Sequence, residues 1–343
     1  MVEQADPGVA AARRTAPGAG AGRRGLWGVG RRGSSGAGRR GYVVAGFAVV
    51  VAGVPAFHRA VPNSPGRMGS LLESFLPWVA VAVVVLLGIA LWRRSTVALV
   101  ALLLPAGVWV YLFGGLLLPA SDAGERELVV VQHNVSDENT DPAVAARALV
   151  EAGPDLIALE ELVVPHLPAY EKALAPDYPH HVVRGTVGLW SKYPLSGERL
   201  VDIKPPSIPA GWSRGVRAVV HSPHGDVAAY VAHLPSVRVG AGGLASALRD
   251  ESAELLGRAI AAEPVDTVIL LGDLNGAVED RGLAPLTSRL NVAERGFAFS
   301  FPAAFPLARI DQVMARSATV GHIRTLPATG SDHLPVAARV ALE

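Results

Sequence analysis

The chain has 343 residues, of which 50% are hydrophobic and 18% are charged, and its formal net charge is +1. A mean hydropathy of +0.33 is high for a chain that lies wholly in water, so we expect membrane segments. The absence of cysteine excludes disulfides, thiolate nucleophiles and cysteine-bound zinc.

Residues 1–40 form the first segment and consist mostly of glycine, alanine and arginine. They carry eight arginines against two acids and too few apolar side chains for a core, which predicts a disordered basic tail. A nucleic-acid-binding arm is an alternative interpretation. Arginine-rich tails that precede an apolar helix, however, more often set the orientation of that helix in a membrane.

Three apolar stretches follow within residues 41–120. The first, Tyr42–Phe57, has about 16 residues and needs a few more beyond His58 to cross about 30 Å of hydrocarbon. Phe75–Trp92 and Thr96–Pro119 are uncharged over 18 or more residues and are long enough. A cleaved signal peptide would explain only the first stretch, and soluble helices would alternate polar and apolar faces. We therefore predict three transmembrane helices.

The distribution of arginine predicts the topology of these helices. Arg93 and Arg94 fill the short turn between the second and third stretches, whereas the longer 58–70 loop has only two arginines. Because positive charge is retained in the cytoplasm, we expect the tail and the arginine turn there. Three crossings then place residues 121–343 outside the cytoplasm of a multi-pass membrane protein. This part is acidic, since from Asp122 onward 16 arginines and three lysines face 27 acids.

Short apolar runs alternate with helical patterns from residue 127 onward. The runs expected as strands are Leu128–Val131, Leu156–Leu159, Val187–Trp190, Ala218–His221, Val227–Val231 and Val268–Leu271. The segments expected as helices are Pro142–Ala152, with Asp141 as its N-cap, and Gly243–Ala262. Because strands outnumber helices, we predict an α/β sandwich with helices on its outer faces, and not a doubly wound parallel sheet.

Polar residues stand directly after several of the predicted strands, where the side chains of a sheet can converge on one cleft. They supply carboxylates, amides and two histidines, without a serine or cysteine nucleophile beside a base. This set suits attack of water on a phosphate ester. A carboxylate such as Glu161 would hold Mg²⁺ or Mn²⁺, another carboxylate would activate the water, and histidines would offset the charge. Each motif alone is as easily a turn or a helix cap, so the prediction depends on their conjunction.

The ordered motifs resemble the endonuclease/exonuclease/phosphatase superfamily over residues 127–343. The motifs are Gln132-His133-Asn134-Val135, Leu159-Glu160-Glu161, His233-Leu234-Pro235-Ser236, Gly272-Asp273-Leu274-Asn275, Arg309-Ile310-Asp311 and Ser331-Asp332-His333. The resemblance implies a four-layer α/β sandwich, with two central sheets flanked by helices and the active site at one end of the sheets, here preceded by the three transmembrane helices. It also implies a metal-dependent phosphoric ester hydrolase with Mg²⁺ (or Mn²⁺) as its cofactor.

The resemblance further implies which residues bind the metal. Glu161 would be the main ligand, with Asn134 beside it contacting metal-bound water or phosphate, and Asp332 would help on the metal side. The chain departs from the family pattern at two positions. Glu160 stands where glutamine is usual, and His133 often has an aromatic counterpart. By the two-residue period of a strand, we expect Glu160 to point to the face opposite Glu161.

The remaining matched residues would carry the chemistry. Asp273 would position or deprotonate the attacking water, and Asn275 would bind a phosphate oxygen. His333 would contact the phosphate and would be oriented by Asp311, a pairing that favours the charged imidazole. His233 would lie near the leaving oxygen.

Membership of a fold does not choose a substrate, because this scaffold serves nucleic acids, inositol phosphates and lipids. Binding of a polyanion usually requires a basic surface, whereas this domain is acidic and tethered. We therefore expect a lipid-linked phosphate ester as the substrate, association with a membrane, and no protein partner. An extracellular DNA or RNA nuclease and a non-catalytic binding domain on the same fold are the alternatives.

The basic tail, three helices and outward domain are similar to those of actinobacterial membrane proteins associated with teicoplanin resistance. His133-Asn134-Val135, Leu159-Glu160-Glu161-Leu162 and the segment 305–312 carry this narrower resemblance. It implies action on polyprenyl (pyro)phosphates or related cell-wall lipid intermediates, and hence a link to antibiotic resistance.

Overall fold

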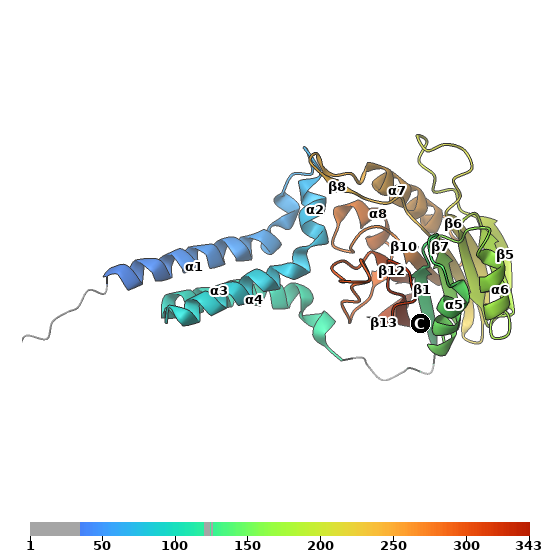
Figure 1. Cartoon of the computed structure of the whole chain (residues 1–343), viewed down its shortest axis with the longest axis horizontal. Coiled ribbons are helices and arrows are strands. Elements are labelled where there is room, and N and C mark those ends of the chain that lie inside the picture. Colours follow the sequence, from blue (N-terminus) through green and yellow to red (C-terminus); the bar gives the residue numbers. More distant parts are fainter. Residues whose placement is uncertain (1–34, 120–123, 125) are drawn as a thin grey trace, which may run out of the picture.

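The computed structural model describes residues 35–119, 124 and 126–343, and Figure 1 shows long helices that project from an α/β part. The projecting elements are α1 (Ser35–Ala56), η1 (His58–Ala60), α2 (Met68–Ser74), η2 (Leu76–Trp78), α3 (Val79–Trp92), α4 (Thr96–Phe113) and η3 (Gly114–Leu117). The predicted tail lies mostly outside the described residues. Because α1 begins at Ser35, its first turns extend into the segment for which we predicted a tail.

Helices α1, α3 and α4 pack side by side as a bundle (Figure 1). Small residues allow this close approach, since Ala48, Ala90 and Ala98 are fully buried where the helices meet. Other apolar side chains point outward, and the side chain of Tyr111 is 88% exposed. A helix bundle with apolar residues on its outside is typical of a lipid environment.

Helix length supports fewer membrane crossings than the sequence predicted. In the described part of the chain, Thr96–Leu117 is the one helix that is long and apolar enough to cross a membrane by itself. The pair Met68–Ser74 and Leu76–Trp92 meets the same criterion only together, with a bend of 63° between its halves. Gly41–Ala56 is apolar but shorter. The predicted stretch Phe75–Trp92 therefore corresponds to the helical segment Leu76–Trp92, and the bend at Phe75 separates it from α2.

Two six-stranded mixed sheets form the centre of the α/β part, as predicted. The first has the order β13-β14-β1-β2-β4-β3, and the second has the order β11-β12-β10-β7-β6-β5. Their strands are β1 (Glu127–Asn134), β2 (Leu156–Glu160), β3 (His180–Arg184), β4 (Val187–Ser191), β5 (Leu195–Leu200), β6 (Gly215–Ser222), β7 (Gly225–Ala232), β10 (Val268–Asp273), β11 (Asn291–Val292), β12 (Asp311–Arg316), β13 (Ala318–Thr325) and β14 (Val336–Leu342).

Alternating side chains of the strands divide the core into layers. Leu128 and Val130 of β1 point into the space between the sheets, whereas Val131 points to the helices on the outer face. Helices α5 (Pro142–Glu151) and α6 (Leu167–Leu174) cover the first sheet, and α7 (Ala247–Ala261) and α8 (Ala284–Thr287) cover the second. The predicted cap of α5 is confirmed, because the Asp141 carboxylate accepts a hydrogen bond from the Val144 amide at 3.0 Å.

The helix predicted from Gly243 begins later than expected. Gly243–Leu244 forms strand β9, which pairs with β8 (Val239–Gly240) in a small hairpin, and α7 starts at Ala247. The apolar period that suggested an earlier start includes Leu244, which is buried as part of the hairpin. The hairpin matters for function because it lies beside the cavity described below.

An ion pair fastens the helix bundle to the α/β part. Glu73 of α2 is the only acidic residue between residues 41 and 121, and it is fully buried. Its carboxylate accepts hydrogen bonds from the Arg281 guanidinium at 2.7 and 2.8 Å, and His58 lies 2.8 Å away on the other side. A second pair joins Arg67 to Asp250 of α7. Because buried charges are held only with their partners, these contacts fix where the bundle sits on the domain.

Aromatic side chains complete the contact between the bundle and the domain. Trp78 stacks on Phe299 at 5.3 Å and donates a hydrogen bond to the Leu307 carbonyl at 2.7 Å. Trp109 of α4 stacks on Phe297 at 6.2 Å. The indole rings thus hold the 297–307 segment of the domain against the ends of the helices.

Candidate active site

The predicted polar residues meet at one end of the two sheets, where β1, β2, β7 and β10 finish. Five of them line a cavity of about 280 Å³: Glu161, Asp273, Asn275, Asp332 and His333. The other three contact this set without lining the cavity: Asn134 and His233 lie next to Asp273, and Asp311 lies next to His333. The sheet ends therefore bring together all eight side chains that the sequence singled out.

Asp273 lies at the centre of the cluster, at the last position of β10. Gly272 permits this placement, because a Cβ there would collide with the carbonyl of Ala232 on the neighbouring strand β7. The Asp273 carboxylate is almost fully buried, and burial raises its pKa, together with the nearby charge of Asp311. A carboxylate with a raised pKa can accept a proton near neutral pH.

Two amides surround the Asp273 carboxylate. Asn134 donates a hydrogen bond to Asp273 Oδ2 at 3.1 Å, and the side chain of Asn275 donates to the same oxygen at 3.2 Å. The backbone amide of Asn275 donates to Oδ1 at 2.9 Å. Asn275 has a φ of +49°, a conformation that asparagine tolerates better than most residues. These contacts hold the carboxylate in one orientation.

Glu161 stands at the mouth of the cavity, directly after β2. Its φ of +59° ends the strand and turns its side chain out of the pleated alternation. The carboxylate is 27% exposed, and its Oε1 lies 3.8 Å from His233 Nε2. Its other oxygen accepts a hydrogen bond from the Asp137 amide at 3.3 Å. Glu161 thus presents oxygen to the cavity, whereas Asp273, Asp311 and both histidines are buried.

His333 and Asp311 form a buried charged pair. His333 Nδ1 lies 2.8 Å from Asp311 Oδ2, and Nε2 points to Asp273 Oδ2 at 3.8 Å. Burial alone would lower the pKa of His333, but the charge and hydrogen bond of Asp311 raise it to about 10. Burial opposes ionisation of Asp311 too, yet the contacts of His333 and Ser300 hold its pKa below the usual value. The imidazole is therefore a cation at neutral pH.

His233 differs from His333 in charge. It follows β7, is fully buried and lies with Nε2 3.5 Å from Asp273 Oδ2. Burial lowers its pKa well below the usual value, and the adjacent Arg214 guanidinium, 3.2 Å from Nδ1, lowers it further. His233 is thus neutral, and Arg214 supplies the positive charge that we had expected from a second histidine.

The two departures from the family pattern are buried behind the cluster. Glu160 points between the sheets, and its carboxylate accepts a hydrogen bond from Gln132 at 2.7 Å. Gln132 also donates to Asp311 at 3.0 Å. Burial raises the pKa of Glu160 well above its usual value, and the nearby charges of Asp311 and Asp273 raise it further. His133 faces away, 2.7 Å from the Thr329 hydroxyl.

The donor groups fit a hard divalent cation at Glu161. Asp273, Asp311 and His333 also offer atoms within 4.8 Å of one another. Protonated His333, however, has no free lone pair, and Asp311 is occupied by hydrogen bonds, so these two are better explained as a carboxylate–imidazole pair. Glu161 is the carboxylate that faces the cavity with free acceptor capacity, and Asp332 is exposed in the same lining.

The structure adds residues that the sequence patterns did not indicate. Arg214 and Ser300 contact the cluster from positions outside every motif, and Phe301 packs on the His333 ring at 4.8 Å. Two more, Ser74 and Phe75, line the cavity from the turn between α2 and η2. These residues lie outside the motifs, and their contacts with the cluster depend on how the chain folds.

Comparison with known proteins agrees with this geometry. A model of the Endonuclease/Exonuclease/phosphatase family matches residues 131–333, which include all eight predicted site residues. No curated protein matches the chain.

Several solved structures are similar to the α/β part. The endonuclease/exonuclease/phosphatase from Bacteroides vulgatus has a TM-score of 0.52 at 17% identity, covering 64% of this chain and 100% of that one. The protein of the same description from Beutenbergia cavernae DSM 12333 has a TM-score of 0.51 at 19% identity, covering 64% and 72%. D. rerio TDP2 complexed with single strand DNA product has a TM-score of 0.52 at 18% identity, covering 62% and 98%. At such identities the likeness concerns the fold.

Proposed function

This chain belongs to the endonuclease/exonuclease/phosphatase family of metal-dependent phosphoester hydrolases, and we propose that it is a membrane-anchored phosphoesterase whose substrate lies at the membrane surface. The observation that carries this proposal is the composition of the cavity wall. Buried Asp273 and His333 form its floor, while Ser74 and Phe75 enter its wall from the helix bundle.

Glu161 would hold the cation, with Asn134 and Asp332 nearby. When bound, Mg²⁺ or Mn²⁺ would act as a Lewis acid on a phosphate oxygen. The requirement for a divalent cation is a property of the family.

Asp273 is the group that we assign to the attacking water. Its raised pKa suits proton uptake, and the amides of Asn134 and Asn275 keep its carboxylate in place. Asn275 also faces the cavity, where its side chain can reach a phosphate oxygen. Positioning of the water and the ester in one geometry supplies a large part of the rate enhancement in such reactions.

Positive charge comes from two sides of Asp273. His333, kept protonated by Asp311, would offset charge that develops on the phosphate oxygens. Arg214 lies behind neutral His233, which would donate a hydrogen bond to the leaving oxygen. The histidines therefore have different roles in this proposal, one electrostatic and one as a neutral donor.

The lining of the cavity favours a substrate with an apolar group. Besides Phe75, the apolar residues Val239 and Leu244 come from the β8–β9 hairpin, and the side chain of Val239 is 65% exposed. A polyprenyl (pyro)phosphate or a related cell-wall lipid intermediate would place its phosphate on the floor and its hydrocarbon along this wall. Action on such lipids is also what a teicoplanin-resistance type of protein would require.

We expect the purified full-length chain with Mg²⁺ to release phosphate from a polyprenyl diphosphate in preference to an inositol phosphate or plasmid DNA. Phe75→Ala should lower kcat/KM for the polyprenyl substrate roughly 10-fold, since an aromatic contact of about 1.5 kcal/mol is lost. Its activity on a small soluble phosphate ester should stay unchanged. Phosphate release and plasmid nicking are the measurements.

Leu200→Ala, at a half-exposed apolar residue of β5, is the matched control. Efficient nicking of the plasmid, without release of phosphate from the lipid, would show that the protein is a nuclease and not a lipid phosphoesterase. Failure on every phosphate ester would point to a non-catalytic binding domain on this fold.

The proposal includes an extracytoplasmic position for residues 121–343. Figure 1 shows α1 and α4 ending at the domain and the α3–α4 turn at the far end of the bundle, an arrangement that three crossings would produce. Arg93 and Arg94 lie in that far turn. An alkaline phosphatase fused after Glu343 should therefore be active in intact cells. A fluorescent fusion without phosphatase activity would place the domain in the cytoplasm and remove outer-leaflet lipids from consideration.

A further inference from the structure

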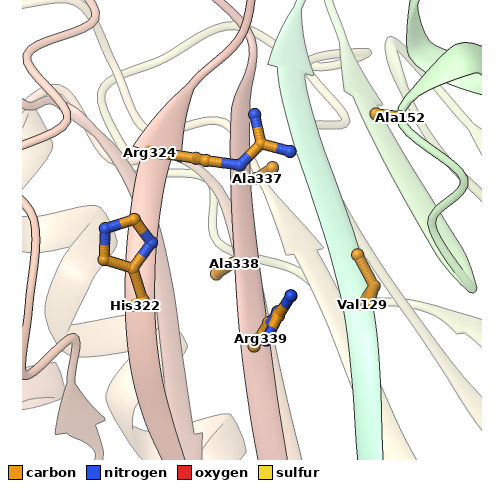
Figure 2. A pocket seen from close by; sticks show the side chains of 7 residues that line it. All are labelled: Val129, Ala152, His322, Arg324, Ala337, Ala338 and Arg339. Carbon is orange, nitrogen blue, oxygen red and sulfur yellow. The ribbon is translucent and has the colours of Figure 1, made fainter. Parts of the chain in front are cut away.

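A second cavity, of about 290 Å³, lies on the outer face of the first sheet and is lined by basic side chains (Figure 2). His322 and Arg324 of β13 and Arg339 of β14 point into it, beside Val129 of β1 and Ala152 after α5. The active-site residues point between the sheets or into the other cavity, so the two are separate. We call this second cavity the basic cleft.

The cations of the basic cleft have no compensating acids. Within residues 126–343, neither Arg324 nor Arg339 forms an ion pair with a carboxylate, although acids outnumber bases in this part of the chain. Burial lowers the pKa of His322, and the charges of Arg324, Arg339 and Arg295 lower it further, with no acid acting in the opposite direction. An arrangement of mutually repelling cations in one concave site is typical of a binding site for an anion.

The basic cleft adjoins the end of the membrane helix α4. The Arg295 guanidinium donates a hydrogen bond to the Pro119 carbonyl at 3.1 Å, and the Gly296 amide donates to the Leu116 carbonyl at 2.9 Å. Residue 295 in turn pairs with His322 of β13. One short run of hydrogen bonds therefore connects the helix end to the cleft.

Aromatic residues flank the cleft on the side of the bundle. Phe297 and Phe299 share a neighbouring cavity with His322 and Arg324, and these two phenylalanines stack on Trp109 and Trp78. Aromatic rings beside arginines at the end of an apolar helix are the usual composition of a membrane interface.

We propose that the basic cleft binds the headgroup of an anionic phospholipid of the membrane in which the chain is anchored. The proposal depends on the membrane anchoring proposed above, but not on the hydrolytic activity. Arg324 and Arg339 would each contact the phosphate diester, and the adjoining phenylalanines would face the acyl chains. A nucleic acid fits less well, because the domain around the cleft is acidic.

The test uses the purified full-length chain in a neutral detergent, with EDTA present so that hydrolysis does not interfere. Dioctanoyl phosphatidylglycerol is the probe, dioctanoyl phosphatidylcholine is the neutral comparison, and glycerol phosphate represents the free anion. We expect the wild type to bind the first probe, more weakly at high salt, and to bind the other two at least 10-fold more weakly. The double variant Arg324→Gln/Arg339→Gln should lose roughly 10-fold to 30-fold in affinity for phosphatidylglycerol, at about 1 kcal/mol per arginine.

Arg184→Gln/Arg258→Gln, which removes two exposed arginines elsewhere on the domain, is the matched control and should bind like the wild type. Equal affinity of the cleft variant and the wild type would overturn the proposal. So would glycerol phosphate binding as tightly as the lipid, which would indicate a site for a free anion. With Mg²⁺, the cleft variant should hydrolyse a soluble phosphate ester at the wild-type rate. Loss of lipid binding with intact hydrolysis thus separates this proposal from the proposed catalytic function.

Discussion

Glu161→Ala is expected to reduce phosphoester hydrolysis by roughly 10³-fold while the fold remains intact. Glu161 is the carboxylate that faces the cavity from its mouth, and we assign it the direct protein bond to the cation. Removal of that bond removes the Lewis acid, which contributes several kcal/mol to stabilisation of the transition state. The measurement is turnover of a soluble phosphate ester across a range of Mg²⁺ concentrations.

Excess EDTA should abolish the activity of the wild type, and added Mg²⁺ or Mn²⁺ should restore it. Glu198→Ala, at an exposed glutamate of β5, is the matched control because it removes the same charge far from the cavity. Because Glu161 is partly exposed, the alanine variant should keep the thermal midpoint of the wild type in the absence of metal. Full turnover by the wild type in EDTA would contradict the assignment of a metal-dependent site.

Asp273→Asn should lower kcat on the order of 10²-fold or more, and its effect on KM should be small. The asparagine has nearly the same shape, and its one oxygen can still accept from the side-chain amides of Asn134 and Asn275, but it cannot accept the proton of the attacking water. A loss confined to kcat would therefore reflect the chemical step and not the binding of substrate.

His333→Ala should lower kcat by a similar factor for a different reason, since it removes the imidazolium cation that Asp311 stabilises. For Asp273→Asn, the matched control is Asp266→Asn, which makes the same substitution at an exposed aspartate. Wild-type turnover in both the Asp273 and the His333 variants would show that the site has been assigned to the wrong residues, even though the family is established.

Much of the catalytic domain could be predicted because its signals are local. An apolar run such as Val268–Leu271 encodes a buried strand, and the polar residues that follow it must emerge at the end of that strand. The excess of such runs over helical segments predicted a sandwich with outer helices, and the family resemblance implied its two central sheets. Where local signals compete, prediction was less accurate. Leu244 fits a helical period, yet it pairs with Val239 in the hairpin.

Glu160 shows how backbone conformation overrides a simple period. The alternation of side chains along a strand places Glu160 and Glu161 on opposite faces of the sheet. It does not reveal which of the two carboxylates faces the cavity. The left-handed conformation of Glu161 turns its carboxylate to the cavity mouth and leaves Glu160 buried between the sheets, hydrogen bonded to Gln132. That choice depends on how β2 meets the strands beside it, and a sequence pattern does not contain this information.

The sequence by itself determined which polar side chains follow the strands, where the apolar helices lie, and how charge differs between the two ends of the chain. Composition and the period of apolar residues are enough to predict each of these features. Only the tertiary structure decided which distant segments meet. Strand order brings Arg214 to His233 and Ser300 to Asp311, and the Glu73–Arg281 pair brings Phe75 to the cavity. The basic cleft arises in the same way, from side chains on two paired strands. Contacts of this kind depend on register and packing between elements, so they become visible only when the chain has folded.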